Sequence, residues 1–388
     1  MSDLEHSAEP PTNYVEAFET FGACRLRNGV MYRGRIRADL AEDIDVLHGI
    51  LSTAPGEHHI EEVDGDVYAT IRIYRPGKEP RQRLWLHIGL LLLTTITVLG
   101  AGAELSRTEP RGLSLIPFEF VIDSTAYWIE GHGAAIIQDL LPKFLAAMRG
   151  GAPYAAALLF ILLAHEMGHY ITAKRYGIDA TLPFLLPAPL FFGTVGAVIR
   201  MRSPIAHRRA LFDVGIAGPI AGLVASLIVC FIGLRLSSYV AIAEAPYVPF
   251  EFGRSLVFRA MSHLALAPGG PEDVLLWHPV LIAGWFGFFL TFLNMLPVGQ
   301  LDGGHVWYAL VGSKQKHVGR VALVSLFGLG LVSVGWIMLA TLVLLILRIG
   351  HPPVVDESVG LGRGRLAVGI AMIVFFALLF VAVPIKPL

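Results

Sequence analysis

Six apolar runs dominate this sequence, and each is long enough to cross a lipid bilayer as a helix. They lie at about 84–103, 151–173, 210–234, 274–296, 319–347 and 366–383. A bilayer core offers no water to backbone polar groups, so apolar runs of about 20 residues fold there as helices. The composition agrees, because 54% hydrophobic residues and a mean hydropathy of +0.62 are too apolar for a soluble chain of 388 residues. We therefore predict a mainly α-helical, polytopic membrane protein with about six transmembrane helices.

The fifth run contains Gly328, Gly330 and Gly335, so it is either one long helix or two short ones. Two helices there would raise the number of transmembrane helices to seven. In this prediction, residues 84–388 form one transmembrane domain.

Residues 1–83 are polar and predict a small N-terminal α+β domain on the cytosolic side. Residues 30–37 and 67–74 have the pattern of strands, and residues 39–51 have the pattern of a helix capped near Asp39. A basic hinge at 75–83 follows. This domain carries no catalytic signature.

The second apolar run contains the sequence His165-Glu166-Met167-Gly168-His169. In an H-E-x-x-H motif on a helix, the two histidines lie one turn apart on the same face and can bind zinc. The glutamate can then act on a metal-bound water. Ionisable groups inside an apolar run of membrane length are costly and are usually functional. The motif therefore predicts a zinc site with His165 and His169 as ligands and Glu166 as the catalytic base.

The distribution of Lys and Arg predicts which side of the membrane this motif faces. Basic residues gather at 75–83, at 174–209 and at 314–320, whereas the 235–273 loop has three bases and four acids. Because basic residues are enriched in cytosolic loops, the first three segments are expected in the cytosol. The H-E-x-x-H motif then lies toward the cytosolic end of its helix.

A catalytic zinc ion usually has three protein ligands, so the two histidines need a third. The candidate is Asp302, which follows the fourth apolar run in the stretch Asn294-Met295-Leu296-Pro297-Val298-Gly299-Gln300-Leu301-Asp302-Gly303-Gly304. Pro297 and the glycines are expected to break the helix and turn Asp302 inward. The predicted topology brings Asp302 to the same face of the membrane as the histidines.

These two motifs together resemble the site-2 protease family of intramembrane zinc metalloproteases. The family pattern pairs H-E-x-x-H with a later N-x-x-P-x-x-x-L-D-G, here Asn294 to Gly303. No PDZ-like insertion is evident, and the N-terminal domain resembles the branch found in bacteria and plastids. The resemblance implies one zinc ion per chain on His165, His169 and Asp302, Glu166 as general base, and a catalytic core at about 151–312.

Substrate-binding positions are also predicted. Asn294, an amide in an apolar helix, either packs against another helix or binds the substrate backbone; the resemblance favours the second. Prolines in 183–202 prevent a continuous helix, and residues 193–199 look like a strand. A re-entrant β-like loop there could pair with an extended substrate through Gly193 and Gly196, although a plain cytosolic loop is equally consistent with the sequence.

The predicted activity is hydrolysis of peptide bonds in transmembrane proteins, within or near the bilayer. A zinc or proton transporter and an inactive membrane scaffold remain alternatives. Transporters tend to contain internal repeats, and only one H-E-x-x-H segment occurs. The expected partners are transmembrane protein substrates and lipid, with no nucleic acid. The expected location is a bacterial cytoplasmic membrane, with the active site toward the cytosol.

Overall fold

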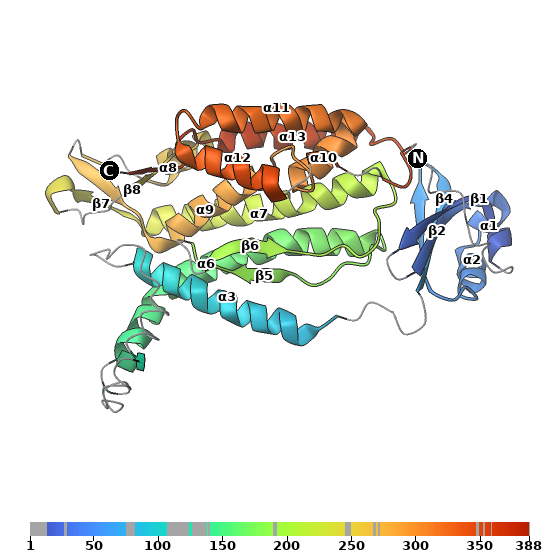
Figure 1. Cartoon of the computed structure of the whole chain (residues 1–388), viewed down its shortest axis with the longest axis horizontal. Coiled ribbons are helices and arrows are strands. Elements are labelled where there is room, and N and C mark those ends of the chain that lie inside the picture. Colours follow the sequence, from blue (N-terminus) through green and yellow to red (C-terminus); the bar gives the residue numbers. More distant parts are fainter. Residues whose placement is uncertain are drawn as a thin grey trace.

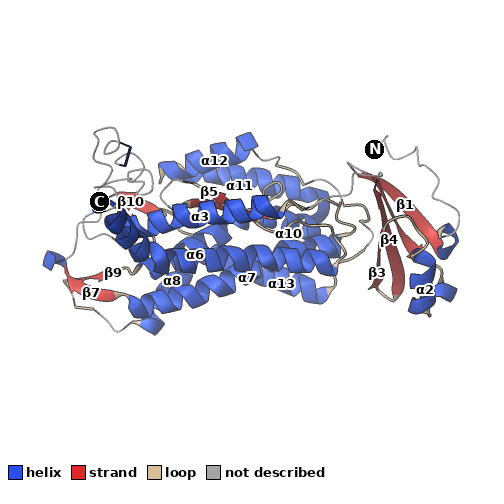
Figure 2. Ribbon diagram, turned by 90° about the horizontal axis from the view of Figure 1, so that it is seen from below, coloured by secondary structure: helices blue, strands red, loops and turns tan. Residues whose placement is uncertain are grey.

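The computed structural model describes the chain except for residues 1–13, 27–28, 75–81, 107–123, 126–137, 139, 189–191, 245–249, 267–268, 271, 347–348, 352–353, 358 and 388. A small β-sheet domain lies beyond one end of an elongated bundle of helices (Figures 1 and 2). Most of the predicted hinge at 75–83 lies outside the described residues.

The N-terminal domain is built on a four-stranded antiparallel sheet with the strand order β1-β2-β4-β3. Its elements are η1 (Val15–Ala17), β1 (Phe18–Leu26), β2 (Gly29–Ile36), α1 (Ala38–Ala41), α2 (Ile44–Leu51), β3 (Glu57–Val63) and β4 (Asp66–Tyr74). Leu47 and Leu51 of α2 are buried in a core with Tyr32 and Ile71 of the sheet. The predicted strands at 30–37 and 67–74 are confirmed as β2 and β4.

The prediction of a single helix at 39–51 is wrong. This segment is divided into α1 and α2, because Asp43 has an extended backbone (φ −122°, ψ 92°) that interrupts the helix. The Asp43 side chain then accepts a hydrogen bond from the Val46 amide, so Asp43 rather than Asp39 caps the longer helix.

Among the described residues, three helices are long and apolar enough to cross a membrane: α3 (Leu84–Leu105), α6 (Leu141–Arg175) and α7 (Arg208–Leu236). Two of them pack closely through glycines. A Cβ atom on Gly102 of α3 would lie only 2.6 Å from the carbonyl oxygen of Gly151 in α6. Such contacts between small residues allow helix backbones to approach in a bilayer, where packing replaces the hydrophobic effect.

Helix α6 begins earlier than the predicted run at 151–173. Residues 141–150 continue into it without a break, and Pro153 lies inside the helix.

The rest of the bundle consists of shorter helices: α8 (Leu256–Ala265), α9 (Pro279–Asn294), α10 (Asp302–Val311), α11 (Gln315–Leu329), α12 (Val334–Ile346) and α13 (Arg363–Leu379), with 3₁₀ turns η3 (Ile242–Glu244) and η4 (Gly312–Lys314). The fifth apolar run is therefore two helices, α11 and α12. Helices α9, α12 and α13 have 16, 13 and 17 residues, so the number of membrane crossings stays a prediction.

The described part of the chain also contains three two-stranded sheets: β5 (Phe184–Pro187) with β6 (Thr194–Val198), β7 (Ser238–Ala241) with β9 (Asp273–Leu276), and β8 (Phe250–Phe252) with β10 (Ile385–Pro387). The β5–β6 hairpin runs along the bundle between α6 and α3 (Figure 1). The strand predicted at 193–199 is confirmed as β6. The loop between β5 and β6 contains Pro189, which lies outside the described residues.

Candidate metal centre

His165, Glu166 and His169 all lie on α6 with buried side chains. The helical spacing of four residues places both imidazoles on one face, as the sequence motif predicts. Their ring centroids are 4.9 Å apart, and their Nε2 atoms are 3.2 Å apart. Both histidines therefore present the same nitrogen to one point in space.

Asp302 meets the two histidines from α10. Its Oδ2 atom is 3.1 Å from Nε2 of His165, and its Oδ1 atom is 3.2 Å from Nε2 of His169. Ligand atoms about 2.1 Å from a tetrahedral zinc ion lie roughly 3.4 Å from one another, so the three side chains fit that ion. Two imidazoles and a carboxylate are also donors that zinc prefers. This is a set of three residues able to hold a metal ion.

A break between α9 and α10 brings Asp302 to this position. Helix α9 ends at Asn294, and Gly299 in the connecting turn has a positive φ of 55°. A Cβ atom on Gly303 would overlap the carbonyl of Met295, so the turn requires glycine there. The predicted helix break is confirmed.

His169 is oriented from behind by helix α7. Its Nδ1 atom donates a hydrogen bond to the backbone carbonyl of Val214 at 2.7 Å. With the proton held on Nδ1, Nε2 keeps a free lone pair toward Asp302 and the metal position. Such a second contact to a metal-binding histidine sets its tautomer and ring orientation.

Two glycines of α7 make room for the histidine rings. A Cβ atom on Gly222 would lie 2.8 Å from Nδ1 of His165, and one on Gly218 would overlap the ring of His169. Spacing of four residues places both glycines on one face of α7. The Gly-x-x-x-Gly pattern therefore serves the site, beyond ordinary helix packing.

Glu166 lies beside the metal position and beside the β5–β6 hairpin. Its carboxylate accepts a hydrogen bond from the backbone amide of Ile199, the residue that follows β6. Asn294, the last residue of α9, has its Nδ2 atom 3.2 Å from Nε2 of His165. Asn294 is thus within reach of a group bound at the metal position.

The two predicted glycines of the hairpin have different surroundings. Gly193 packs against α3, where its carbonyl accepts a hydrogen bond from the Thr97 hydroxyl at 2.6 Å. Gly196 has a φ of 119°, and a Cβ atom there would meet nothing within 4 Å. Of the two, only Gly196 borders open space.

Sequence reasoning missed Val214, Ile199 and the role of the α7 glycines at this site. Val214 and Ile199 act through backbone groups, which every residue type except proline offers in the same form. No side-chain pattern marks them. The glycines carried a signal, the four-residue spacing, but that pattern indicates close packing without naming the partner.

The comparisons with known proteins agree with this geometry. Residues 153–332 match the Peptidase family M50 model, a segment that contains both histidines, Glu166 and Asp302. A rice protein (Oryza sativa subsp. japonica) named probable zinc metalloprotease EGY1, chloroplastic, is 28% identical over 386 residues, which are 92% of this chain and 62% of the rice protein. No solved structure matches.

Two Arabidopsis thaliana proteins are similar as well. The one named probable zinc metalloprotease EGY1, chloroplastic, is 27% identical over 93% of this chain and 67% of its own length. The one named probable zinc metalloprotease EGY2, chloroplastic, is 31% identical over 50% of this chain and 35% of its own length. The chain thus spans about two thirds or less of the length of these relatives. Residues 153–332 of this chain are a Peptidase family M50 domain, the domain of the site-2 protease family.

Proposed function

We propose that this chain is an intramembrane zinc metalloprotease that hydrolyses peptide bonds of transmembrane proteins within or near the bilayer. The observation that carries the proposal is the meeting of two buried imidazoles and a carboxylate, with ligand atoms 3.1–3.2 Å apart, next to a buried glutamate. The site is built on a helix long and apolar enough to cross a membrane. The names of the relatives, zinc metalloproteases, support the same activity.

In this proposal His165, His169 and Asp302 hold one zinc ion per chain. Zinc bound there would polarise the scissile carbonyl and lower the pKa of a water molecule at the site. Glu166 accepts a proton from that water and passes it to the leaving amine. The Ile199 amide holds the Glu166 carboxylate in place for both transfers.

The substrate would bind as an extended strand, because a helix hides its amide bonds. Strand β6 pairs with β5 on one side, and no other described strand pairs with it. The side chains of Val195 and Val198 on β6 are 60% and 46% exposed, and the strand leads directly to the contact between Ile199 and Glu166. A substrate strand added to β6 would therefore lie next to the catalytic base.

Asn294 and Gly196 complete the proposed substrate site. The Asn294 amide is placed to donate a hydrogen bond to the substrate backbone or to the oxyanion that develops during hydrolysis. Gly196 leaves space for the substrate chain to approach β6. Gly193, also a sequence candidate, is better suited to holding the hairpin against α3.

We place the protein in a bacterial cytoplasmic membrane with the metal centre toward the cytosol. The support is the excess of basic residues at 174–209 and 314–320, next to the ends of α6 and α10. The relatives are named as chloroplastic.

The direct test of the proposal is zinc content measured together with cleavage. Purified full-length protein should contain about one zinc ion per chain and should cleave a single-span membrane protein in detergent. His165→Ala should lose most of the zinc and all of the cleavage. A His317→Ala variant, which changes an exposed histidine of α11 outside the proposed ligand set, is the matched control and should keep both. Unchanged zinc in His165→Ala would refute the site.

A further inference from the structure

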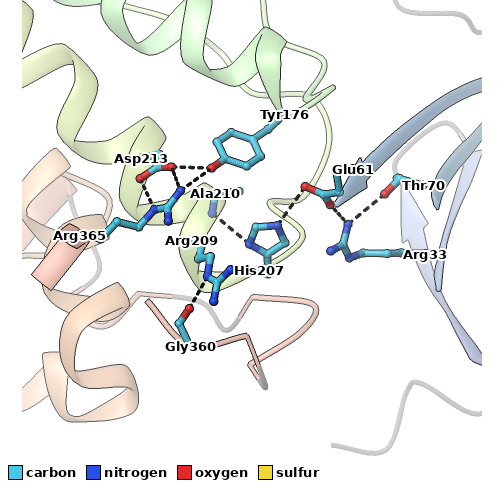
Figure 3. Close-up of polar contacts among 10 residues, drawn as sticks. All are labelled: Arg33, Glu61, Thr70, Tyr176, His207, Arg209, Ala210, Asp213, Gly360 and Arg365. Atoms are coloured by element: carbon cyan, nitrogen blue, oxygen red, sulfur yellow. Dashed lines mark hydrogen bonds and ion pairs between the residues drawn. The ribbon is translucent and has the colours of Figure 1, made fainter. Parts of the chain in front are cut away.

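A polar junction joins the N-terminal domain to the start of helix α7 (Figure 3). At its centre, Nε2 of His207 donates a hydrogen bond to Oε2 of Glu61 at 3.2 Å. Glu61 lies on β3 and is separated from His207 by 146 residues of sequence. Arg33 of β2 forms an ion pair with the other oxygen of the same carboxylate.

His207 is buried, and Glu61 is mostly buried. His207 is 1% exposed, and the Glu61 side chain is 12% exposed. Burial alone would raise the pKa of Glu61, but the hydrogen bond from His207 and the charge of Arg33 together lower it to about 2. Glu61 is therefore a carboxylate at neutral pH, held by groups from two different parts of the chain.

His207 also caps helix α7. Its Nδ1 atom accepts a hydrogen bond from the Ala210 amide at 3.1 Å, which satisfies one of the free amides in the first turn. Since Nδ1 accepts and Nε2 donates, one imidazole ring connects the sheet domain directly to the helix end. The edge of this ring also packs against Tyr176 at the end of α6, with centroids 5.8 Å apart.

Helix α7 then leads from His207 to the metal centre within two turns. Val214, whose carbonyl holds Nδ1 of His169, lies seven residues after His207. The neighbouring residue, Asp213, is fixed by Arg365 of α13 at 2.8 and 2.7 Å and by the Tyr176 hydroxyl at 2.5 Å (Figure 3). A shift of the start of α7 would move the carbonyl that orients His169.

The junction is polar rather than a continuous hydrophobic core. Outside its centre, Asp64 forms an ion pair with Arg209 at 2.6 Å, and Arg72 donates to the Ser203 hydroxyl at 3.4 Å. The Nε and Nη2 atoms of buried Arg33 have no hydrogen-bond partner among the described residues. A cavity of about 10 Å³, lined by Glu61, Arg72 and Ser203 among others, lies in the same place. Polar, incompletely satisfied contacts are typical of domains that can separate.

We propose that the N-terminal domain controls the metal centre by docking on His207, with Glu61 and His207 as positioning residues. The docked domain fixes the start of α7, and α7 in turn fixes the ring of His169 through the Val214 carbonyl. When the domain separates, His169 loses its orientation and the site binds zinc less tightly. This inference rests on the proposed zinc metalloprotease function.

The test compares two ways of changing His207 in the full-length protein. His207→Asn keeps a side chain that caps a helix well but is too short to reach Glu61, whereas Glu61→Ala removes the link from the other side. Both variants, and the double variant, should lose zinc to a chelator about tenfold faster than wild type and should show a similarly lower kcat. Loss of an outer contact to a metal ligand commonly costs 10–100-fold in metal affinity.

Two further variants separate this proposal from general damage. Glu19→Gln removes an exposed carboxylate that pairs with Arg35 inside the same domain, and it should behave as wild type. Asp64→Asn removes the exposed ion pair to Arg209 while keeping a residue that tolerates the positive φ of 58° at this position. It should weaken docking without unfolding the domain and should shift zinc release in the same direction as Glu61→Ala, by a smaller factor.

The results of this test distinguish failure of the docking proposal from failure of the proposed protease function. If wild type binds zinc and cleaves, but His207→Asn, Glu61→Ala and Asp64→Asn release zinc and cleave at the wild-type rate, the docking proposal is wrong and the protease proposal stands. Effects of His207→Asn and Glu61→Ala that add in the double variant would also contradict it, because one shared contact can be broken only once. A wild type without zinc would instead contradict the protease proposal.

Discussion

The ring of His169 is held from both sides, by the Val214 carbonyl at 2.7 Å on Nδ1 and by Asp302 at 3.2 Å on Nε2. The first contact comes from α7 and the second from α10, so the geometry of the metal centre depends on three elements that are distant in sequence. Changes in α7 should therefore alter zinc binding even though α7 provides no ligand.

Gly218→Ala should abolish zinc binding, because the added methyl group would overlap the His169 ring. Gly222→Ala should also weaken zinc binding, but by less, because its methyl group would lie 2.8 Å from Nδ1 of His165. Elemental analysis of the purified variants measures both. Gly328→Ala is the matched control, since nothing lies within 4 Å of a Cβ atom at that helical position. Full zinc content in Gly218→Ala would contradict the described packing.

Asp302→Asn should lose both zinc and cleavage. A neutral amide is a much poorer zinc ligand than a carboxylate, although it has the same shape. The expected loss of zinc affinity is at least about 100-fold, measured by competition with a chelator of known affinity. Zinc retained at wild-type affinity in Asp302→Asn would remove Asp302 from the ligand set.

The stability contributed by Glu61 should depend on pH. Its pKa is about 2 in the folded protein and 4.5 as the reference value, so its stabilisation is present above about pH 4.5 and is lost as the pH falls toward 2. The size is about 3 kcal/mol, from the difference between 4.5 and about 2 at roughly 1.4 kcal/mol per pKa unit. The difference in Tm between wild type and Glu61→Gln, measured in detergent, should shrink as the pH is lowered from 7 to 3. A difference that stays constant would show that the Glu61 charge does not stabilise the docked domain.

The segment that provides the two histidines and the segment that provides Asp302 should lie on the same side of the membrane. Single cysteines at exposed Arg200 and Lys314 should react with a membrane-impermeant reagent only from the cytosolic side. A cysteine at exposed Arg254 should react only from the opposite side, because this residue connects β8 to α8, which lie at the other end of the bundle from α10 (Figure 1). Labelling of Arg200→Cys and Lys314→Cys from different sides would be incompatible with the site.

The sequence was most informative where a single segment carries its own signal. The long apolar runs predicted α3, α6 and α7, and the helix break before Asp302 followed from Pro297 and the glycines. The three ligand candidates also came from motifs. Their meeting at one point required the structure, because the distance between segments 137 residues apart is set by packing that no local pattern encodes.

Other features could not be predicted for the same reason. The contact between Glu61 and His207 joins two domains, and neither residue is unusual in its own segment. The division of α1 from α2 depends on the extended backbone of Asp43, a residue that also fits inside a helix pattern. Helix α6 continues through Pro153, where a proline would usually mark a helix start.

The measurement that tests the central claim most directly is zinc content and cleavage by Glu166→Gln. Glu166 follows His165 by one residue, about 100° around the helix, so in this account it acts on water at the metal position and is not one of the three ligands. Glutamine keeps the shape and the hydrogen bond from Ile199 but cannot take a proton from water at neutral pH. Glu166→Gln is expected to keep one zinc ion per chain and its affinity for substrate, while kcat falls by several orders of magnitude. Cleavage at a near wild-type rate would contradict the hydrolytic mechanism.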